Sequence, residues 1–272
     1  MTVMTNDGLL AVADRLGVQT LPLVLAVGPQ QDSMATWKAA QQQAVAELRG
    51  AGVLDPDGEV TSELADALFT LAQPDRELVA RIYGGAPAPI RICLARRGEQ
   101  HALAVRTGDS FDITRVWSDG SGAALVRPVL AALGGCAPAA RGGCAPADVV
   151  NFSAPATDLS ERLQSAETSA DYADAIYALG VLDRDATAYG LAFASCHAYA
   201  EIVAYAHDDG VTTRPPGAVV VYDTGRGRIV VAPGIAPDQQ VWSTVTPGTE
   251  HRIAQAISGL IEALPGGRWL LH

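Results

Sequence analysis

The chain has 272 residues, of which 49% are hydrophobic, and a formal net charge of −11. A chain of this length can bury a full core without disulfides or metals, whereas its acidity, with Lys38 as the only lysine, argues against nucleic-acid binding. The N-terminus lacks a signal-peptide pattern and the longest apolar runs, such as 21–27, are far below the ~20 residues that span a bilayer, so we expect a cytoplasmic protein without stable membrane insertion.

The first half predicts helices, then antiparallel strands, then a closing helix. A helix is expected over 61–72, because Leu64, Leu68 and Leu71 recur on one helical face. Period-two alternation or short apolar runs predict strands at 77–83, 90–95, 102–106 and 111–117, with turns at 84–89 and 96–100. A helix over 121–133 closes this half, and Pro128 is expected to kink it or to shift its start.

A doubled GGCAPA sequence, at residues 134–139 and 142–147, follows this closing helix. Its cysteines, Cys136 and Cys144, are too widely spaced for the short-spaced pairs of a structural zinc site, and no histidine lies nearby. We therefore interpret residues 135–155 as a linker between halves at about 1–134 and 156–272, which together form a single domain.

The second half repeats the same order of helices, strands and a closing helix. Helical segments in two or three pieces are expected over 158–195, followed by strands at 199–206, 218–222, 228–232 and 241–246. The strands at 218–222 and 228–232 read as a hairpin around residues 223–227. The clearest helix covers 249–264, with Thr249 as its N-cap and a stripe of isoleucine and leucine as its core face.

The two halves also resemble each other in sequence. GVLD at 52–55 recurs at 180–183, and ELVA at 77–80 recurs as EIVA at 201–204, offsets of 128 and 124. Matches in the same order at similar offsets indicate a duplication. Strands grouped apart from helices indicate the α+β class. We therefore predict one shared, mostly antiparallel sheet surrounded by helices, with quasi-two-fold symmetry.

No familiar catalytic signature is present: the sequence has no G-x-S-x-G, no P-loop and no H-E-x-x-H. His207, Asp208 and Asp209 could ligate a metal, but neighbours on an extended chain point to opposite faces, so a solvated turn ending at Gly210 is the preferred interpretation. The Cys196-His197 pair is interpreted as a helix end with a buried cysteine. No metal or other cofactor is expected, and the residues favour a protein-binding surface.

Five short stretches, in order along the chain, resemble the EspG family: DGLLAVADRL at 7–16, ARRG at 95–98, YAEIVA at 199–204, TPGT at 246–249 and LPGGRW at 264–269. The resemblance implies a central antiparallel sheet flanked by N- and C-terminal helical bundles. It also implies a cytoplasmic chaperone of a mycobacterial type VII (ESX) secretion system. Such a chaperone binds PE–PPE heterodimers at the PPE tip, keeps them soluble and delivers them to the secretion machinery, without catalysis or a cofactor.

The resemblance also suggests contact residues. Thr212, Thr213 and Arg214 match a partner-facing strand, although they could equally form a solvated loop before two prolines. Candidate apolar contacts in the C-terminal bundle are Tyr172, Ile176 and Tyr177, for which ordinary core packing is the alternative. Residues 84–89 are too few to act as a long gripping loop. A small-molecule enzyme or ligand-binding protein on an α+β scaffold remains the second hypothesis, and a deep pocket with converging polar groups would favour it.

Overall fold

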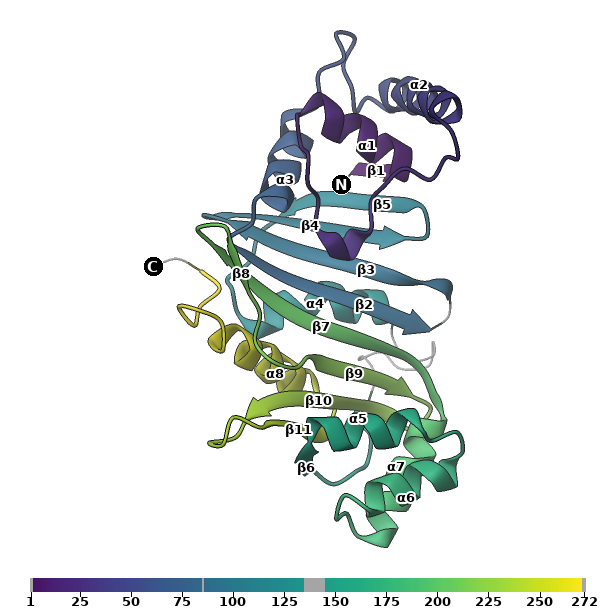
Figure 1. Cartoon of the computed structure of the whole chain (residues 1–272), viewed down its shortest axis with the longest axis vertical. Coiled ribbons are helices and arrows are strands. Elements are labelled where there is room, and N and C mark those ends of the chain that lie inside the picture. Colours follow the sequence, from purple (N-terminus) through teal and green to yellow (C-terminus); the bar gives the residue numbers. More distant parts are fainter. Residues whose placement is uncertain (1, 85, 135–144, 271–272) are drawn as a thin grey trace.

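A computed structural model describes residues 2–84, 86–134 and 145–270 (Figure 1). Its centre is one large sheet with the strand order β1-β5-β4-β3-β2-β7-β9-β10-β11-β6, to which β8 is attached through β7. All pairs of these strands are antiparallel. The expected α+β fold with an antiparallel central sheet is confirmed. The cysteines Cys136 and Cys144 lie outside the described residues.

The elements follow the same order in both halves. In the first half they are β1 (Thr2–Thr5), α1 (Asn6–Arg15), the 3-10 turn η1 (Leu23–Leu25), α2 (Met34–Gly50), α3 (Ser62–Ala72), β2 (Arg76–Gly84), β3 (Ala86–Arg97), β4 (Gln100–Thr107), β5 (Ser110–Val116) and α4 (Gly122–Leu133). In the second half they are β6 (Phe152–Pro155), α5 (Ala156–Gln164), α6 (Ser169–Tyr177), α7 (Asp183–Ala194), β7 (Cys196–Asp208), β8 (Val211–Thr213), β9 (Val219–Thr224), β10 (Gly227–Ile235), β11 (Val241–Pro247) and α8 (Glu250–Glu262).

A pseudo-two-fold axis passes through the seam between β2 and β7. Val79 lies opposite Val203, and these two residues occupy equivalent places in the ELVA and EIVA repeats. The repeat offset of 124 relates Glu77 to Glu201 and Arg81 to Tyr205. In the sheet, Glu77 pairs with Tyr205 and Arg81 pairs with Glu201, so the repeat exchanges these two pairs. The pairing therefore maps onto itself, which confirms the quasi-two-fold repeat.

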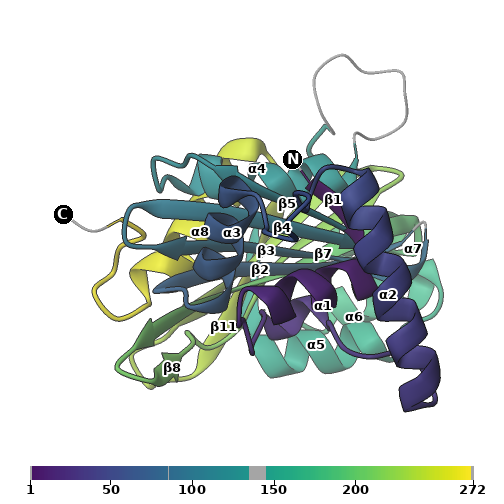
Figure 2. The same cartoon turned by 90° about the horizontal axis from the view of Figure 1, so that it is seen from above.

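One face of the sheet is covered at its centre by α4 and α8, which pack against each other (Figure 2). The core on this face includes Leu78, Ala80 and Ile82 of β2 together with Ile202 of β7. The two helices approach closely at Gly122, where an added Cβ would lie 2.0 Å from a backbone oxygen of α8. This helix pair fixes the centre of the sheet from behind.

The other face is covered only towards its two ends. A second core lies under α1 and α3 over the N-terminal strands, and a third lies under α5, α6 and α7 over the C-terminal strands. Their members on the strands alternate with those of the first core, so both belong to the opposite face. The middle of this face, over β2 and β7, lies between the two helical groups (Figure 1).

The structure corrects several expected boundaries. Cys196 is half-buried and begins β7, so the Cys196-His197 pair does not end a helix. β2 and β3 reach Gly84 and Ala86, which shortens the expected turn. Phe152–Pro155 form β6 on the edge strand β11, although they fall within the range assigned to the linker. Pro128 lies inside α4, which runs unbroken from Gly122 to Leu133. The division into halves joined by a linker stays a prediction.

Candidate functional site

We name the uncovered middle of the sheet the open face. Strand alternation places Glu77, Val79, Arg81 and Tyr83 of β2 on it, since Leu78, Ala80 and Ile82 point into the core beneath α4 and α8. The same alternation places five side chains of β7 on the open face: Tyr199, Glu201, Val203, Tyr205 and His207. An antiparallel sheet can leave one face to water. An exposed strip that lies between two helical groups and carries tyrosine side chains is nevertheless a candidate surface for a protein partner.

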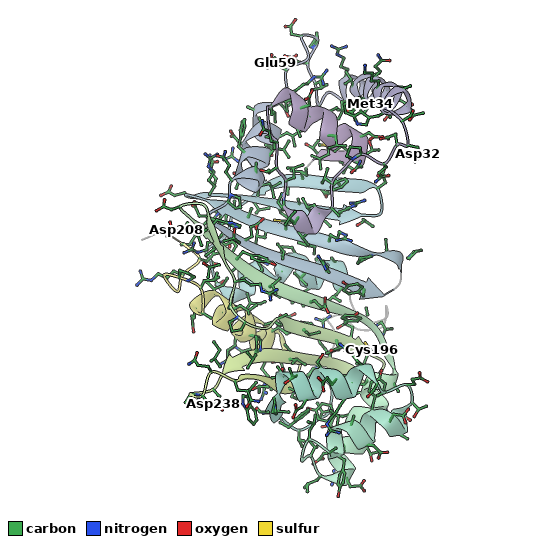
Figure 3. The ribbon with its side chains drawn as sticks, in the orientation of Figure 1. Asp32, Met34, Glu59, Cys196, Asp208 and Asp238 are labelled. Carbon is green, nitrogen blue, oxygen red and sulfur yellow. The ribbon has the colours of Figure 1, made fainter. Side chains whose placement is uncertain are left out.

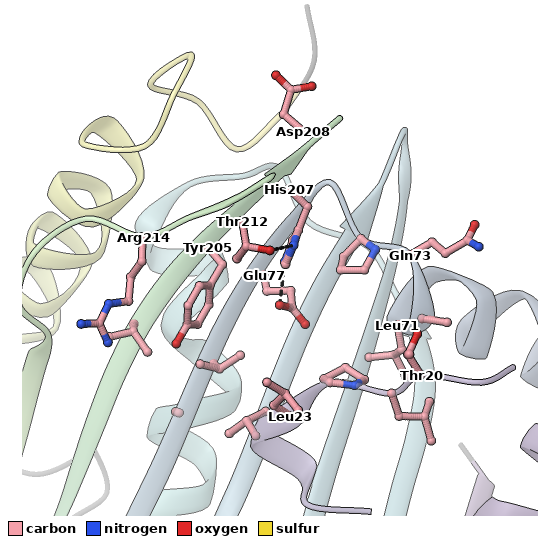
Figure 4. Close-up of a pocket in the computed structure, with 18 of the residues that line it drawn as sticks. Thr20, Leu23, Leu71, Gln73, Glu77, Tyr205, His207, Asp208, Thr212 and Arg214 are labelled. Atoms are coloured by element: carbon pink, nitrogen blue, oxygen red, sulfur yellow. Dashed lines mark hydrogen bonds and ion pairs between the residues drawn. The ribbon is translucent and has the colours of Figure 1, made fainter. Parts of the chain in front are cut away.

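The open face contains two grooves. The N-side groove, of about 1100 Å³, is bounded by residues 20–24, residues 71–74 and the β7–β8 hairpin (Figure 4). The C-side groove, of about 670 Å³, is bounded by α5 and by Tyr172 and Phe193 of the C-terminal helices. Glu201 and Ala218 line both grooves, so the two grooves are adjacent on the face.

The C-side groove is aromatic. Tyr83 and Tyr199 stack across the β2–β7 seam with ring centroids 4.9 Å apart, and Tyr222 lies 5.8 Å from Tyr199. Burial raises the pKa of both Tyr199 and Tyr222, so their hydroxyls stay protonated in the neutral range. Tyrosines of this kind offer an apolar ring and a polar tip, a combination enriched at protein interfaces.

A hydrogen-bond network fixes the wall of the N-side groove. His207 Nε2 lies 2.8 Å from Glu77 Oε2, and its Nδ1 lies 3.1 Å from Thr212 Oγ1 of β8 (Figure 4). The thiol of Cys93 donates to the other oxygen of Glu77 at 3.5 Å. Because burial and the Glu77 charge raise the pKa of the Cys93 thiol, it is a protonated donor and not an activated nucleophile. The network connects β8 to the centre of the sheet.

A single apolar side chain stands on the opposite rim of the N-side groove. Leu23, at the start of η1, is 95% exposed. Its segment is held on the sheet by two arginines, since Arg91 Nη1 donates to the Val24 carbonyl at 3.0 Å and Arg106 Nη1 to the Leu25 carbonyl at 2.7 Å. The leucine is therefore presented to solvent on a fixed support.

The residues expected to contact a partner are dispersed over this surface. Thr212 and Arg214 are exposed and line the N-side groove, whereas the half-buried Thr213 pairs with Ala206 in the β7–β8 ladder. Tyr172 lines the C-side groove.

The remaining two candidates lie elsewhere in α6. Tyr177 is exposed but lines neither groove. Ile176 is 0% exposed in the C-terminal core, which favours the alternative of ordinary core packing, because a fully buried side chain has no surface to offer a partner.

Sequence reasoning missed Leu23 and the floor of the open face. The signal for the floor was present, because in ELVARIY and YAEIVAYAH every second residue is charged, tyrosine or histidine except the central Val79 and Val203. Two strands that both alternate in this way, at the centre of a sheet, indicate one face that is not an ordinary core. No comparable signal marks Leu23, which lies in an irregular segment.

The described residues were compared with the requirements of a metal site and of a membrane-spanning helix. No group of three or more His, Cys, Asp and Glu residues is placed among them to hold a metal ion. The expected turn to Gly210 is shorter than predicted, because His207 and Asp208 still belong to β7 and only Asp209 and Gly210 form the turn. Within the described ranges, none of the helices combines the length and the apolar character needed to cross a bilayer.

Comparison with known proteins gives end-to-end similarity. A model of the EspG family matches residues 5–259. The ESX-1 secretion-associated protein EspG1 of Mycobacterium tuberculosis is 31% identical, over 99% of this chain and 89% of that protein. The ESX-3 secretion-associated protein EspG3 of Mycolicibacterium smegmatis is 31% identical, over 98% and 88%.

Among solved structures, the Mycobacterium tuberculosis type VII secretion system chaperone EspG5, in complex with the PE25-PPE41 dimer, matches with a TM-score of 0.78 at 21% identity. The match covers 100% of this chain and 99% of that one, so the whole arrangement of sheet and helices is shared.

Proposed function

The chain belongs to the EspG family, and we propose that it is a cytoplasmic chaperone of a type VII (ESX) secretion system. It binds the PPE tip of a cognate PE–PPE heterodimer, keeps the dimer soluble and targets it to the secretion machinery. The relatives named as ESX-1 and ESX-3 secretion-associated proteins support the pathway. The neighbour solved with a PE–PPE dimer supports the kind of partner.

The observation that carries this proposal is the open face. Its two adjacent grooves combine an aromatic floor, exposed charges and the exposed Leu23. Interfaces that form and separate typically combine apolar and polar surface in this way. The tip of a helical bundle that covers this face would remove its own apolar patch from water, which is how a chaperone of this kind prevents aggregation.

We propose that Thr212 and Arg214 contact the partner from the wall of the N-side groove and that Tyr172 does so from the C-side groove. Thr213 acts by holding β8 in the sheet. The exposed Tyr177 extends the contact along α6 if the partner reaches beyond the C-side groove.

The role is binding and not catalysis. An enzyme would need polar groups that converge on a substrate. The polar groups that converge in the N-side groove are Glu77, His207 and Thr212, and they bond to one another and so connect β8 to the sheet. The one thiol that joins them, Cys93, is held protonated and fully buried, so it cannot act as a nucleophile.

Co-expression with PE–PPE pairs, followed by size-exclusion chromatography, tests the proposal. We expect a 1:1:1 complex with a cognate pair, and weaker binding after Arg214→Glu, which reverses a charge on the groove wall. Arg127→Glu is the matched control, because Arg127 is an exposed arginine on α4, behind the sheet. Absence of any complex with pairs from every ESX locus would refute the proposed function, whereas equal binding by both variants would remove only Arg214 from the site.

A further inference from the structure

Two opposite charges lie side by side at the centre of the open face. Arg81 of β2 and Glu201 of β7 are directly opposite each other in the antiparallel register. Both side chains are exposed, and both line the N-side groove. Charged residues are uncommon at the centre of a large sheet, where neighbouring layers usually exclude water.

The internal repeat distinguishes Glu201 from its counterpart in the first half. Glu77, the counterpart of Glu201, is 8% exposed and is hydrogen-bonded by His207 and Cys93. By contrast, neither Glu201 nor Arg81 makes a side-chain hydrogen bond or an ion pair within 4.0 Å to another described residue. The same structural position thus holds a satisfied carboxylate in one half and an available one in the other.

A partner that covers the open face takes both charges out of water, and because Arg81 and Glu201 form no ion pair with each other in the structure, each is available to pair with a charge of the partner. A charge removed from water without a counter-charge is strongly unfavourable, whereas a charge that meets its opposite in a buried contact fixes orientation and rejects wrong partners. Directly opposed residues on an antiparallel pair have Cβ atoms about 5 Å apart. One helical tip can therefore present an acidic and a basic side chain to the two residues at once.

Resting on the proposed function, we propose that Arg81 and Glu201 are specificity-determining residues that read an acidic and a basic side chain on the PPE tip. The acidic group lies against Arg81 and the basic group against Glu201, so the tip docks in one orientation. A tip that carries the two charges in the reverse order meets like charges and is rejected.

A charge-swap variant, Arg81→Glu with Glu201→Arg, tests the inference. It keeps the net charge and an opposite pair across the β2–β7 seam, but it exchanges the positions of the positive and the negative side chain that the partner would contact. The control is the swap Asp66→Arg with Arg115→Asp, an exposed surface pair 3.1 Å apart that lines neither groove. We expect the first swap to weaken binding of a cognate PE–PPE dimer by about tenfold or more and the control swap to leave it unchanged.

The neutral variant, Arg81→Gln with Glu201→Gln, keeps the inference testable if the swap fails to fold. It should bind the cognate dimer with a weaker dependence on salt than wild type and should accept non-cognate dimers more readily. If either folded variant matches wild type in affinity, salt dependence and choice of dimer, the inference is wrong although the proposed function stands. If wild type binds no dimer at all, the proposed function fails and the inference falls with it.

Discussion

Truncation of one exposed side chain, Leu23→Ala, should separate binding from stability. Leu23 is 95% exposed in the free protein, so its side chain contributes almost nothing to folding, and we expect the free energy of unfolding to change by less than about 0.5 kcal/mol. Its support does not depend on the side chain, because η1 is held through backbone carbonyls by Arg91 and Arg106. The perturbation is therefore confined to the surface that a partner would cover.

The expected loss of affinity follows from the apolar surface removed. Leucine to alanine deletes three carbon atoms, and each buried methylene contributes about 0.8 kcal/mol, so full burial in the complex predicts a loss of about 2 kcal/mol. At about 1.4 kcal/mol for each factor of ten, the dissociation constant should rise roughly 30-fold. Partial burial in the complex would give a proportionately smaller increase.

Isothermal titration with a cognate PE–PPE dimer measures the dissociation constant, and urea unfolding measures stability. The matched control is Met34→Ala, since Met34 is 66% exposed but lies on α2 and lines neither groove (Figure 3). The reasoning is refuted if Leu23→Ala binds as tightly as wild type, or if Met34→Ala loses as much affinity as Leu23→Ala.

Three further predictions concern the scaffold. Gly122→Ala should destabilise the fold by about 1–3 kcal/mol in urea unfolding, because the new Cβ would overlap the backbone of α8, whereas Gly259→Ala, in open space on α8, should be neutral or stabilising by up to about 1 kcal/mol. Asp223→Asn should cost about 3–5 kcal/mol, since it leaves the buried Arg228 guanidinium without its two charged hydrogen bonds, and an unchanged thermal midpoint would contradict this. Burial, assisted by a neighbouring arginine charge, lowers the pKa of His101 in the folded state. The contribution of His101 to stability is therefore complete above about pH 6.5 and is lost as the pH falls through the lower folded-state pKa. Thermal melts from about pH 7.5 to 5 should show this loss of stability, and His101→Gln should make the melting temperature depend less on pH.

The regular parts of the fold were predictable because two patterns agree. Period-two alternation located the long strands of both halves, and the repeat of ELVA as EIVA related one half to the other. The N-terminal helices carry much weaker signals. Of the seventeen residues of α2, only Ala44 and Leu48 are buried, and the helix packs mainly against α1, so its sequence has no strong apolar stripe. The short strands β1, β6 and β8 exist through pairing with neighbours that sequence alone does not identify.

The site was predictable only in part, because the sequence does not show how deeply each side chain is buried. Thr212 and Arg214, which the resemblance to the EspG family suggested, lie in the N-side groove. In α6, helical periodicity places Tyr172 and Ile176 on the same side, yet one lines a groove and the other is fully buried. Which residue of an apolar stripe reaches the surface depends on how the neighbouring helices pack, and that information is not local.

The two halves differ on the surface that we assign to the partner. The second half inserts β8 between β7 and β9, whereas in the first half β3 follows β2 directly. The N-side groove therefore has a wall from β8 facing the rim at η1, and the C-side groove has an aromatic floor beside α5. A symmetric face would accept two equivalent tips related by the axis. Because the grooves differ in walls, charge and aromatic content, and because Glu201 at their junction is exposed while Glu77 is not, the face suits one asymmetric partner held in one orientation.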